Sequence, residues 1–149
     1  MQMTYSLDGL HLTEGFEGCR LDAYQDVAGV WTNGYGNTHG VVPGSTITQE
    51  QAEADLRANV QNAVNAVNRL VTQETIPQHW FDALVDFTFN AGAGNLASST
   101  LLRDVNAGNF AAADLQFQRW DMAGGAHIAG LERRRLAEAA LATEPETYS

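Results

Sequence analysis

The chain of 149 residues has no lysine, one cysteine and three prolines. All eight of its basic residues are arginines, and eighteen acidic residues bring the formal net charge to −10. This balance argues against a nucleic-acid-binding protein, because affinity for phosphate groups depends on cationic side chains. The single cysteine, Cys19, excludes an internal disulfide and a cysteine-based zinc site. We interpret Cys19 as a small buried or half-buried packing residue.

Long apolar runs are also missing. No stretch approaches the roughly 20 apolar residues that span a bilayer, so we expect no membrane insertion. The first six residues lack the charged start and the apolar stretch of a signal peptide. We therefore expect synthesis in the cytoplasm, and a target outside it would require a separate route of release. The four histidines are scattered without a second ligand at helical spacing, so neither a metal site nor any other cofactor is expected.

Hydrophobic periodicity predicts an α+β fold. Period-two patterns indicate short strands between residues 21 and 36, around a turn at Asp26 to Gly29. Apolar residues at helical spacing indicate the longest helix, which Thr48 and Gln51 would open with a capping box. An aromatic and apolar stretch indicates a buried central helix. The predicted helices cover residues 6–16, 48–71, 78–90, 100–106, 110–120 and 128–141, and a frayed tail follows from residue 143.

These elements favour one domain over residues 1–149. It would comprise a small lobe with a β-hairpin sheet (about 1–47), a connecting helix (about 48–71) and a larger all-α lobe (about 72–149). A cleft between lobes is a common place for a ligand.

Two carboxyl groups and a hydroxyl stand out near the N-terminus. Glu17 ends the first predicted helix, Asp26 begins the predicted turn, and Thr32 follows in the second strand. Glycoside hydrolysis requires an acid that protonates the leaving oxygen and a second carboxylate that activates a water or attacks the sugar. Glu14 and Asp22 are the rival acids, and we interpret them as a surface charge and a solvated strand position.

The motifs around these residues resemble phage-type lysozymes, the endolysins of glycoside hydrolase family 24. The resemblance covers about residues 7–141 and rests on Glu17-Gly18, Asp26, Trp31-Thr32, Gly34-Tyr35-Gly36, Phe89-Asn90-Ala91-Gly92, Ser99-Thr100, Arg119-Trp120 and Gly130-Leu131 with Arg133, Arg134 and Glu138. It implies a lysozyme-like fold and a muramidase that cleaves the β-1,4 bond between N-acetylmuramic acid and N-acetylglucosamine in peptidoglycan, with inversion. The implied partner is the glycan strand, and the implied protein is a monomer released to the wall by a holin.

The resemblance also implies roles for single residues. Glu17 would be the general acid, and Asp26 and Thr32 would position the water. Phe89, Asn90 and Thr100 match positions that line the substrate. An arginine of the last helix approaches the catalytic glutamate in this family, and Arg133, Arg134 and Arg135 are the candidates, with a solvated helix face pairing with Glu132 and Glu138 as the alternative.

Two positions depart from the family pattern. Asn33 replaces an aliphatic residue, and Asn37 replaces a histidine. A buried amide at Asn33 requires partners or costs about 1–3 kcal/mol. Two other functions remain open. One is a lytic transglycosylase that uses Glu17 alone, and the other is a non-catalytic wall-binding or virion module on the same fold.

Overall fold

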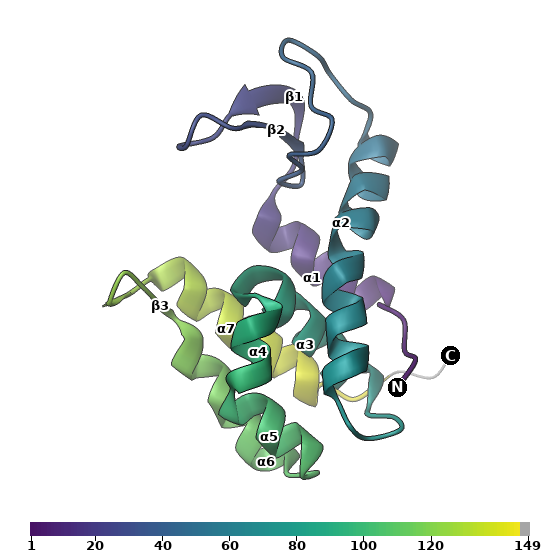
Figure 1. Cartoon of the computed structure of the whole chain (residues 1–149), viewed down its shortest axis with the longest axis vertical. Coiled ribbons are helices and arrows are strands. Elements are labelled where there is room, and N and C mark those ends of the chain that lie inside the picture. The colour runs from purple at the N-terminus through teal and green to yellow at the C-terminus, as the bar shows by residue number, and fades with distance from the viewer. Residues whose placement is uncertain (147–149) are drawn as a thin grey trace. The chain divides into compact units, whose positions relative to one another are not determined.

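The computed structural model describes residues 1–146 and has an α+β fold, as predicted (Figure 1). Along the chain its elements are α1 (Leu7–Glu17), β1 (Arg20–Gln25), β2 (Trp31–Gly34), α2 (Gln49–Leu70), α3 (Gln78–Ala91), α4 (Ala93–Ser98), α5 (Thr100–Asn106), α6 (Phe110–Gln116), the 3-10 helix η1 (Phe117–Trp120), β3 (Met122–Ala123), β4 (Ala126–His127) and α7 (Ala129–Thr143).

The chain divides into two compact units. The hairpin unit is Thr13–Gln61, and the helical unit combines Met1–Leu12 with Asn62–Ser149. The division falls within α1 and within α2, whereas we had placed the ends of the lobes near residues 47 and 71. The assignment of the whole chain to one domain stays a prediction.

The hairpin unit is built on the antiparallel pair β1–β2. Tyr24 pairs with Thr32 in the ladder, and the register shifts between Arg20 and Tyr24. The predicted turn is confirmed, because Gly29 N donates to Asp26 O and Asp26 N donates to Val30 O, both at 2.9 Å. The segment after the hairpin returns along β1 through an isolated bridge between Asp22 and Thr46.

A glycine brings β2 close to the start of α2. Gly34 has φ +55°, and a Cβ at this position would lie 3.2 Å from the Cβ of Ala52. A side chain here would therefore meet both an unfavourable backbone conformation and a neighbouring helix.

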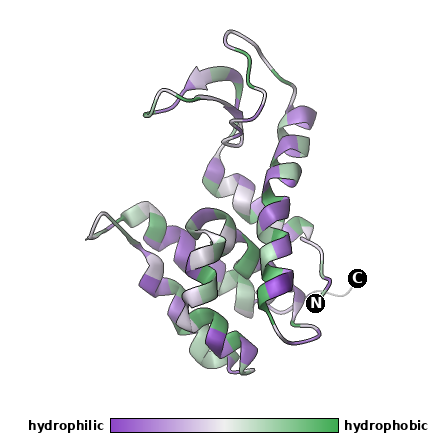
Figure 2. Cartoon of the chain, viewed as in Figure 1, coloured by the Kyte–Doolittle hydropathy of each residue, from purple (hydrophilic) through white to green (hydrophobic). Residues whose placement is uncertain are grey.

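The long helix α2 begins as the sequence predicts, with one difference. Thr48 Oγ1 accepts the backbone N–H of Gln51 at 3.0 Å. The second hydrogen bond of a capping box, from the Thr48 N–H to the Gln51 side chain, is wrongly predicted. The Gln51 amide instead donates to Asp55 at 2.8 Å. Apolar residues recur at helical spacing and are buried, while polar residues lie between them (Figure 2): Ala52, Leu56, Val60, Ala63, Val64 and Val67.

The helical unit is organised around α3, which is buried from His79 to Thr88. This confirms the prediction of a buried central helix. α7 packs against α3, and an aromatic cluster joins α3 to α6 and η1. Its ring centroids lie 5.1 to 6.2 Å apart, within the range of favourable aromatic pairs: Trp80, Phe87, Phe110, Phe117 and Trp120.

The segment between α3 and α7 contains more helices and strands than we had predicted. Gly92 ends α3 with φ +100°, but Gly94 lies inside a short helix, α4, that we had not predicted. The sequence allows either Ser98 or Ser99 to cap α5, and in the structure Ser99 does so by accepting the Leu102 N–H at 3.0 Å. The predicted helix over 110–120 divides into α6 and η1. The sequence indicates a loop at Gly124 and Gly125, and in the structure these two glycines form the turn of a hairpin of β3 and β4.

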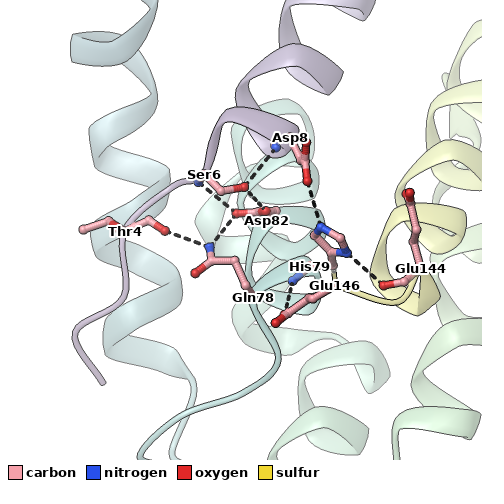
Figure 3. A network of polar contacts seen from close by, with 9 residues as sticks. Thr4, Ser6, Asp8, Gln78, His79, Asp82, Glu144 and Glu146 are labelled. Carbon is pink, nitrogen blue, oxygen red and sulfur yellow. Dashed lines mark hydrogen bonds and ion pairs between the residues drawn. The ribbon is translucent and has the colours of Figure 1, made fainter. Parts of the chain in front are cut away.

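A polar network joins residues 4–8 and residues 144–146 to the start of α3 (Figure 3). Asp82 accepts hydrogen bonds from the Ser6 N–H and hydroxyl and from the Gln78 amide. Burial raises the pKa of Asp82, and these hydrogen bonds oppose that shift. The prediction of a frayed tail from residue 143 is wrong for residues 143–146. α7 continues to Thr143, and residues 144 and 146 contact His79. Residues 147–149 lie outside the described residues.

Candidate active site

Asp26 and Thr32 are linked through the peptide groups of Val30 in the hairpin unit. Asp26 Oδ1 accepts the N–H groups of Ala28 and Val30, both at 2.9 Å. The Thr32 hydroxyl donates to Val30 O at 2.9 Å, and Thr32 is 4% exposed. The turn therefore holds the carboxylate, and β2 holds the hydroxyl, in one locally determined arrangement.

These contacts define what the two side chains can still do. Among residues 1–146, no hydrogen-bond donor reaches Asp26 Oδ2, although Asp26 is only half-exposed. The Thr32 hydrogen is directed to a carbonyl, so its oxygen is left with lone pairs that accept. A carboxylate oxygen and a hydroxyl oxygen are thus both able to accept hydrogen from a water.

Glu17 is the last residue of α1 and is half-buried. Its Oε2 lies 3.4 Å from the point where a Cβ on Gly36 would be. Gly36 has φ +75°, so the loop after β2 approaches the carboxylate through a residue without a side chain. The hairpin unit therefore contains all three predicted catalytic residues: Glu17, Asp26 and Thr32.

The rival acids have ordinary surroundings. Glu14 lies one helical turn before Glu17 and is half-buried. Asp22 is exposed on β1 and accepts the Thr46 hydroxyl at 2.7 Å, which agrees with its interpretation as a solvated strand residue.

Cys19 is exposed, so the interpretation as a buried packing residue is wrong. Its thiol donates to Gln49 Oε1 at 3.6 Å, and the Gln49 amide donates to Tyr35 Oη at 2.8 Å. Partial desolvation raises the pKa of the Cys19 thiol, although a hydrogen bond with Tyr35 opposes the shift.

The two residues that depart from the family pattern, Asn33 and Asn37, are hydrogen-bonded to each other. Asn33 and Asn37 are both buried, and the Asn37 amide donates to Asn33 Oδ1 at 3.0 Å. Their backbones exchange N–H···O bonds at 2.9 and 2.8 Å. Asn37 Oδ1 also accepts from the Asn59 amide at 3.1 Å, and His39 contributes through its backbone. The pair is therefore a closed amide cluster rather than an unpaired buried group.

Phe89 and Asn90 lie at the C-terminal end of α3 in the helical unit. Phe89 is half-buried and Asn90 is exposed. Asn90 Oδ1 accepts a hydrogen bond from Arg135 Nη2 of α7. This contact links a predicted substrate residue to a buried arginine, and the spacing of the residues along the chain gave no signal of it.

Thr100 lines a hollow of about 240 Å³ within the helical unit. Arg103 Nη2 donates to its hydroxyl at 2.8 Å. Phe89 and Asn90 are not part of the lining of this hollow, which combines hydroxyl, amide, guanidinium and aromatic groups: Ser98, Ser99, Thr100, Gln116, Arg119 and Trp120.

The three arginines of α7 have different surroundings. Arg133 is exposed, whereas Arg134 and Arg135 are 5% and 1% exposed, so the solvated-face alternative is wrong for two of them. Arg134 makes a bidentate contact with Asp86 of α3, at 2.9 and 2.8 Å. Arg135 Nε lies 3.0 Å from Glu138 Oε1.

This buried cluster shifts the ionisation of its members. Burial raises the pKa of Glu138 well above its ordinary value, and the neighbouring Asp86 carboxyl adds to the shift. Burial also lowers the pKa of Arg135, against the attraction of Glu138. Two arginines and two carboxyl groups are thus held together in the interior between α3 and α7: Asp86, Arg134, Arg135 and Glu138.

Two features of the described chain bear on other classes of protein. Across residues 1–146, histidine, cysteine and acidic side chains form no group of three suited to holding a metal ion. None of the described helices combines the length and the apolar character needed to cross a membrane.

Comparison with known proteins supplies the family. The family model described as phage lysozyme matches residues 14–138. The endolysin of Acyrthosiphon pisum secondary endosymbiont phage 1 is 42% identical over 145 residues, covering 93% of this chain and 97% of that protein. The endolysin of Bacillus phage B103 is also 42% identical, and the match covers 93% of this chain but only 54% of that longer protein. The muramidase domain of SpmX from Asticaccaulis excentricus superimposes with a TM-score of 0.88 at 37% identity, over 97% of this chain and 100% of that one.

A glycosidase is the class of protein that this fold and these matches define, and its substrate is peptidoglycan. The chain belongs to the phage lysozyme family.

Proposed function

We propose that the chain hydrolyses the β-1,4 bond between N-acetylmuramic acid and N-acetylglucosamine, with inversion at the anomeric carbon. In this mechanism Glu17 gives a proton to the glycosidic oxygen, and a water attacks from the opposite face of the sugar. Asp26 takes a proton from that water, while the Thr32 oxygen accepts its other hydrogen.

The link through Val30 is the observation that supports this proposal best. Asp26 and Thr32 both bond to Val30, so one hairpin holds a carboxylate and a hydroxyl acceptor through a single shared residue. Two acceptors placed on a water orient its lone pair away from them, toward an electrophilic carbon. Positioning of this kind removes part of the entropic barrier to attack.

Substitutions at the three positions test the assignment. Glu17→Gln and Asp26→Asn each remove a proton-transfer group with little change in shape, so clearing of wall suspensions should fall by at least about 100-fold. Thr32→Val removes one acceptor and should have a smaller effect. Glu14→Gln is the matched control, one turn earlier on α1, and should clear walls at the wild-type rate. Clearing by Glu17→Gln at the wild-type rate would overturn the catalytic assignment.

The products separate the related activities. A muramidase leaves reducing N-acetylmuramic acid ends, whereas a lytic transglycosylase leaves anhydro sugars, which mass spectrometry distinguishes. The anomer formed first, followed by NMR on a soluble glycan, tests inversion. An α product supports the role given to Asp26 as base, and a β product would instead require Asp26 to act as a nucleophile.

The state and delivery of the enzyme are part of the same proposal. We expect a monomer that is made in the host cytoplasm and reaches the wall after a holin permeabilises the membrane. Expression in bacteria with and without a holin tests the route, and lysis without the holin would contradict it. Sedimentation measures the oligomeric state.

A further inference from the structure

The Asn90 amide has an unambiguous orientation. Its Oδ1 accepts from Arg135 Nη2, and a guanidinium carries donors but no acceptor. The amide oxygen must therefore face Arg135, and the amide nitrogen must face the other way. Within residues 1–146, no acceptor is recorded for the Nδ2 hydrogens, and Asn90 is exposed. The end of α3 thus presents an NH₂ group to solvent.

Arg135 is held rigidly on the other side of this contact. It is 1% exposed, its Nε lies 3.0 Å from Glu138 Oε1, and its Cζ lies 4.9 Å above the ring of Phe87. Glu138 and Phe87 are both 0% exposed. An ion pair and a cation–π contact therefore restrict the guanidinium from two directions.

The cluster is poorly suited to a purely stabilising role. Arg135 Nη1 and Nε and both Glu138 oxygens are buried without hydrogen bonds of good geometry. Buried ion pairs of this kind are weak evidence for stability, because desolvation of the charges offsets their attraction. Buried polar atoms left unsatisfied call for another explanation.

We propose that Arg135 is a positioning residue for the glycan. It fixes the Asn90 amide so that the NH₂ group donates to an acceptor oxygen of the glycan strand, a hydroxyl or an acetamido carbonyl. This inference rests on the proposed function, and it takes from the family resemblance that Asn90 lines the substrate. Glu138 and Phe87 act through Arg135, and neither touches the substrate.

The first variant removes the donor and keeps the fold. Asn90→Asp retains an oxygen for Arg135 but replaces the outward NH₂ group by an acceptor. We expect KM on soluble peptidoglycan fragments to rise about three- to tenfold, the loss of one hydrogen bond, with kcat changed less than about twofold. Asn62→Asp, an exposed position on α2, is the control with the same added charge and should keep the wild-type KM. A wild-type KM for Asn90→Asp would overturn the contact with the glycan.

The second variant tests the positioning itself. Arg135→Met combined with Glu138→Leu removes the cation and its partner together, which avoids leaving one buried charge unpaired. The freed Asn90 amide can then rotate, so KM should rise by a similar factor. Adding Asn90→Asp to this pair should raise KM little further, because the two changes remove the same oriented donor.

Two results would overturn the positioning role. One is a wild-type KM in the Arg135→Met, Glu138→Leu variant, provided that its circular dichroism and melting transition show a folded protein. The other is full additivity of the Asn90 and Arg135 effects on KM. If the double variant does not fold, Arg135→Lys, which keeps the charge and loses the fork, gives the same comparison. Failure of the muramidase proposal can be distinguished from these results. It would appear as wall clearing by Glu17→Gln or as products other than reducing N-acetylmuramic acid ends, and not as a change in KM.

Discussion

His79 lies between two acceptors, and this geometry predicts how stability depends on pH. Its Nδ1 is 2.8 Å from the carbonyl oxygen of Glu144, and its Nε2 is 2.9 Å from Asp8 Oδ2 (Figure 3). A neutral imidazole carries one N–H and can donate to only one of them, whereas the protonated ring donates to both. The pKa of His79 is accordingly raised from 6.5, first by the Glu144 carbonyl and then by Asp8, although burial opposes the shift.

The sign of the effect follows from this shift. A raised pKa means that the folded protein binds the proton more tightly than the unfolded chain does. The extra stability is fully present below the unfolded pKa of about 6.5 and is lost as the pH rises through the folded pKa. The charge of Asp82 adds to the upward shift of the His79 pKa, and Glu146 accepts the backbone N–H of His79 at 3.3 Å.

His79→Gln isolates this contribution. A glutamine amide can reach the position of Nε2 and donate to Asp8, but it leaves the Glu144 carbonyl without its donor. The lost bond has a charged donor, so we expect the variant to be less stable by about 2 kcal/mol at pH 5. For a chain of this length that corresponds to a melting temperature lower by roughly 4–8 °C. Well above the folded pKa, the neutral histidine also makes one bond, and the difference should fall to within about 0.5 kcal/mol.

The assay is urea unfolding followed by circular dichroism from pH 5 to pH 9. His11→Gln, at an exposed position on α1, is the matched control for replacing a histidine by glutamine. A His79→Gln difference that stays constant over this range, or that grows with rising pH, would refute the argument from two acceptors.

Three further predictions concern single contacts. Asn37→Ala leaves Asn33 Oδ1 and the Asn59 amide without their partner, so we expect a loss of about 1–3 kcal/mol in urea unfolding, and a loss under 0.5 kcal/mol would contradict the closed amide cluster. Leu101→Ala removes a fully buried side chain and should cost about 2–5 kcal/mol in the same measurement; a smaller cost would mean that the site collapses around the cavity. Gly36→Ala places a methyl group 3.4 Å from Glu17 Oε2 on a residue with φ +75°. We expect the free energy of unfolding to fall by about 1–2 kcal/mol and wall clearing to be slower. Unchanged clearing would show that the carboxylate tolerates the contact.

Features that depend on neighbours in the chain were predicted from the sequence. The turn after β1 needs a residue such as Asp26, whose side chain bonds to N–H groups two and four positions on, and Gly29, which has φ +79°. The cap at Ser99 and the apolar face of α2 follow from residues three or four positions apart. Such interactions are set by residue type and spacing, so they can be read before the chain is folded. The link between Asp26 and Thr32 through Val30 is also local, but we had not predicted it.

Contacts between distant segments were decided only by the tertiary structure. Periodicity gave no means of choosing among Arg133, Arg134 and Arg135, and it did not reveal that two of them are buried against α3. The position of His79 is of the same kind, because its partners Asp8 and Glu144 lie 71 and 65 positions away along the chain. The physical reason is that a polar side chain has several possible partners of similar energy, and only the packing of the helices determines which one lies within 3 Å.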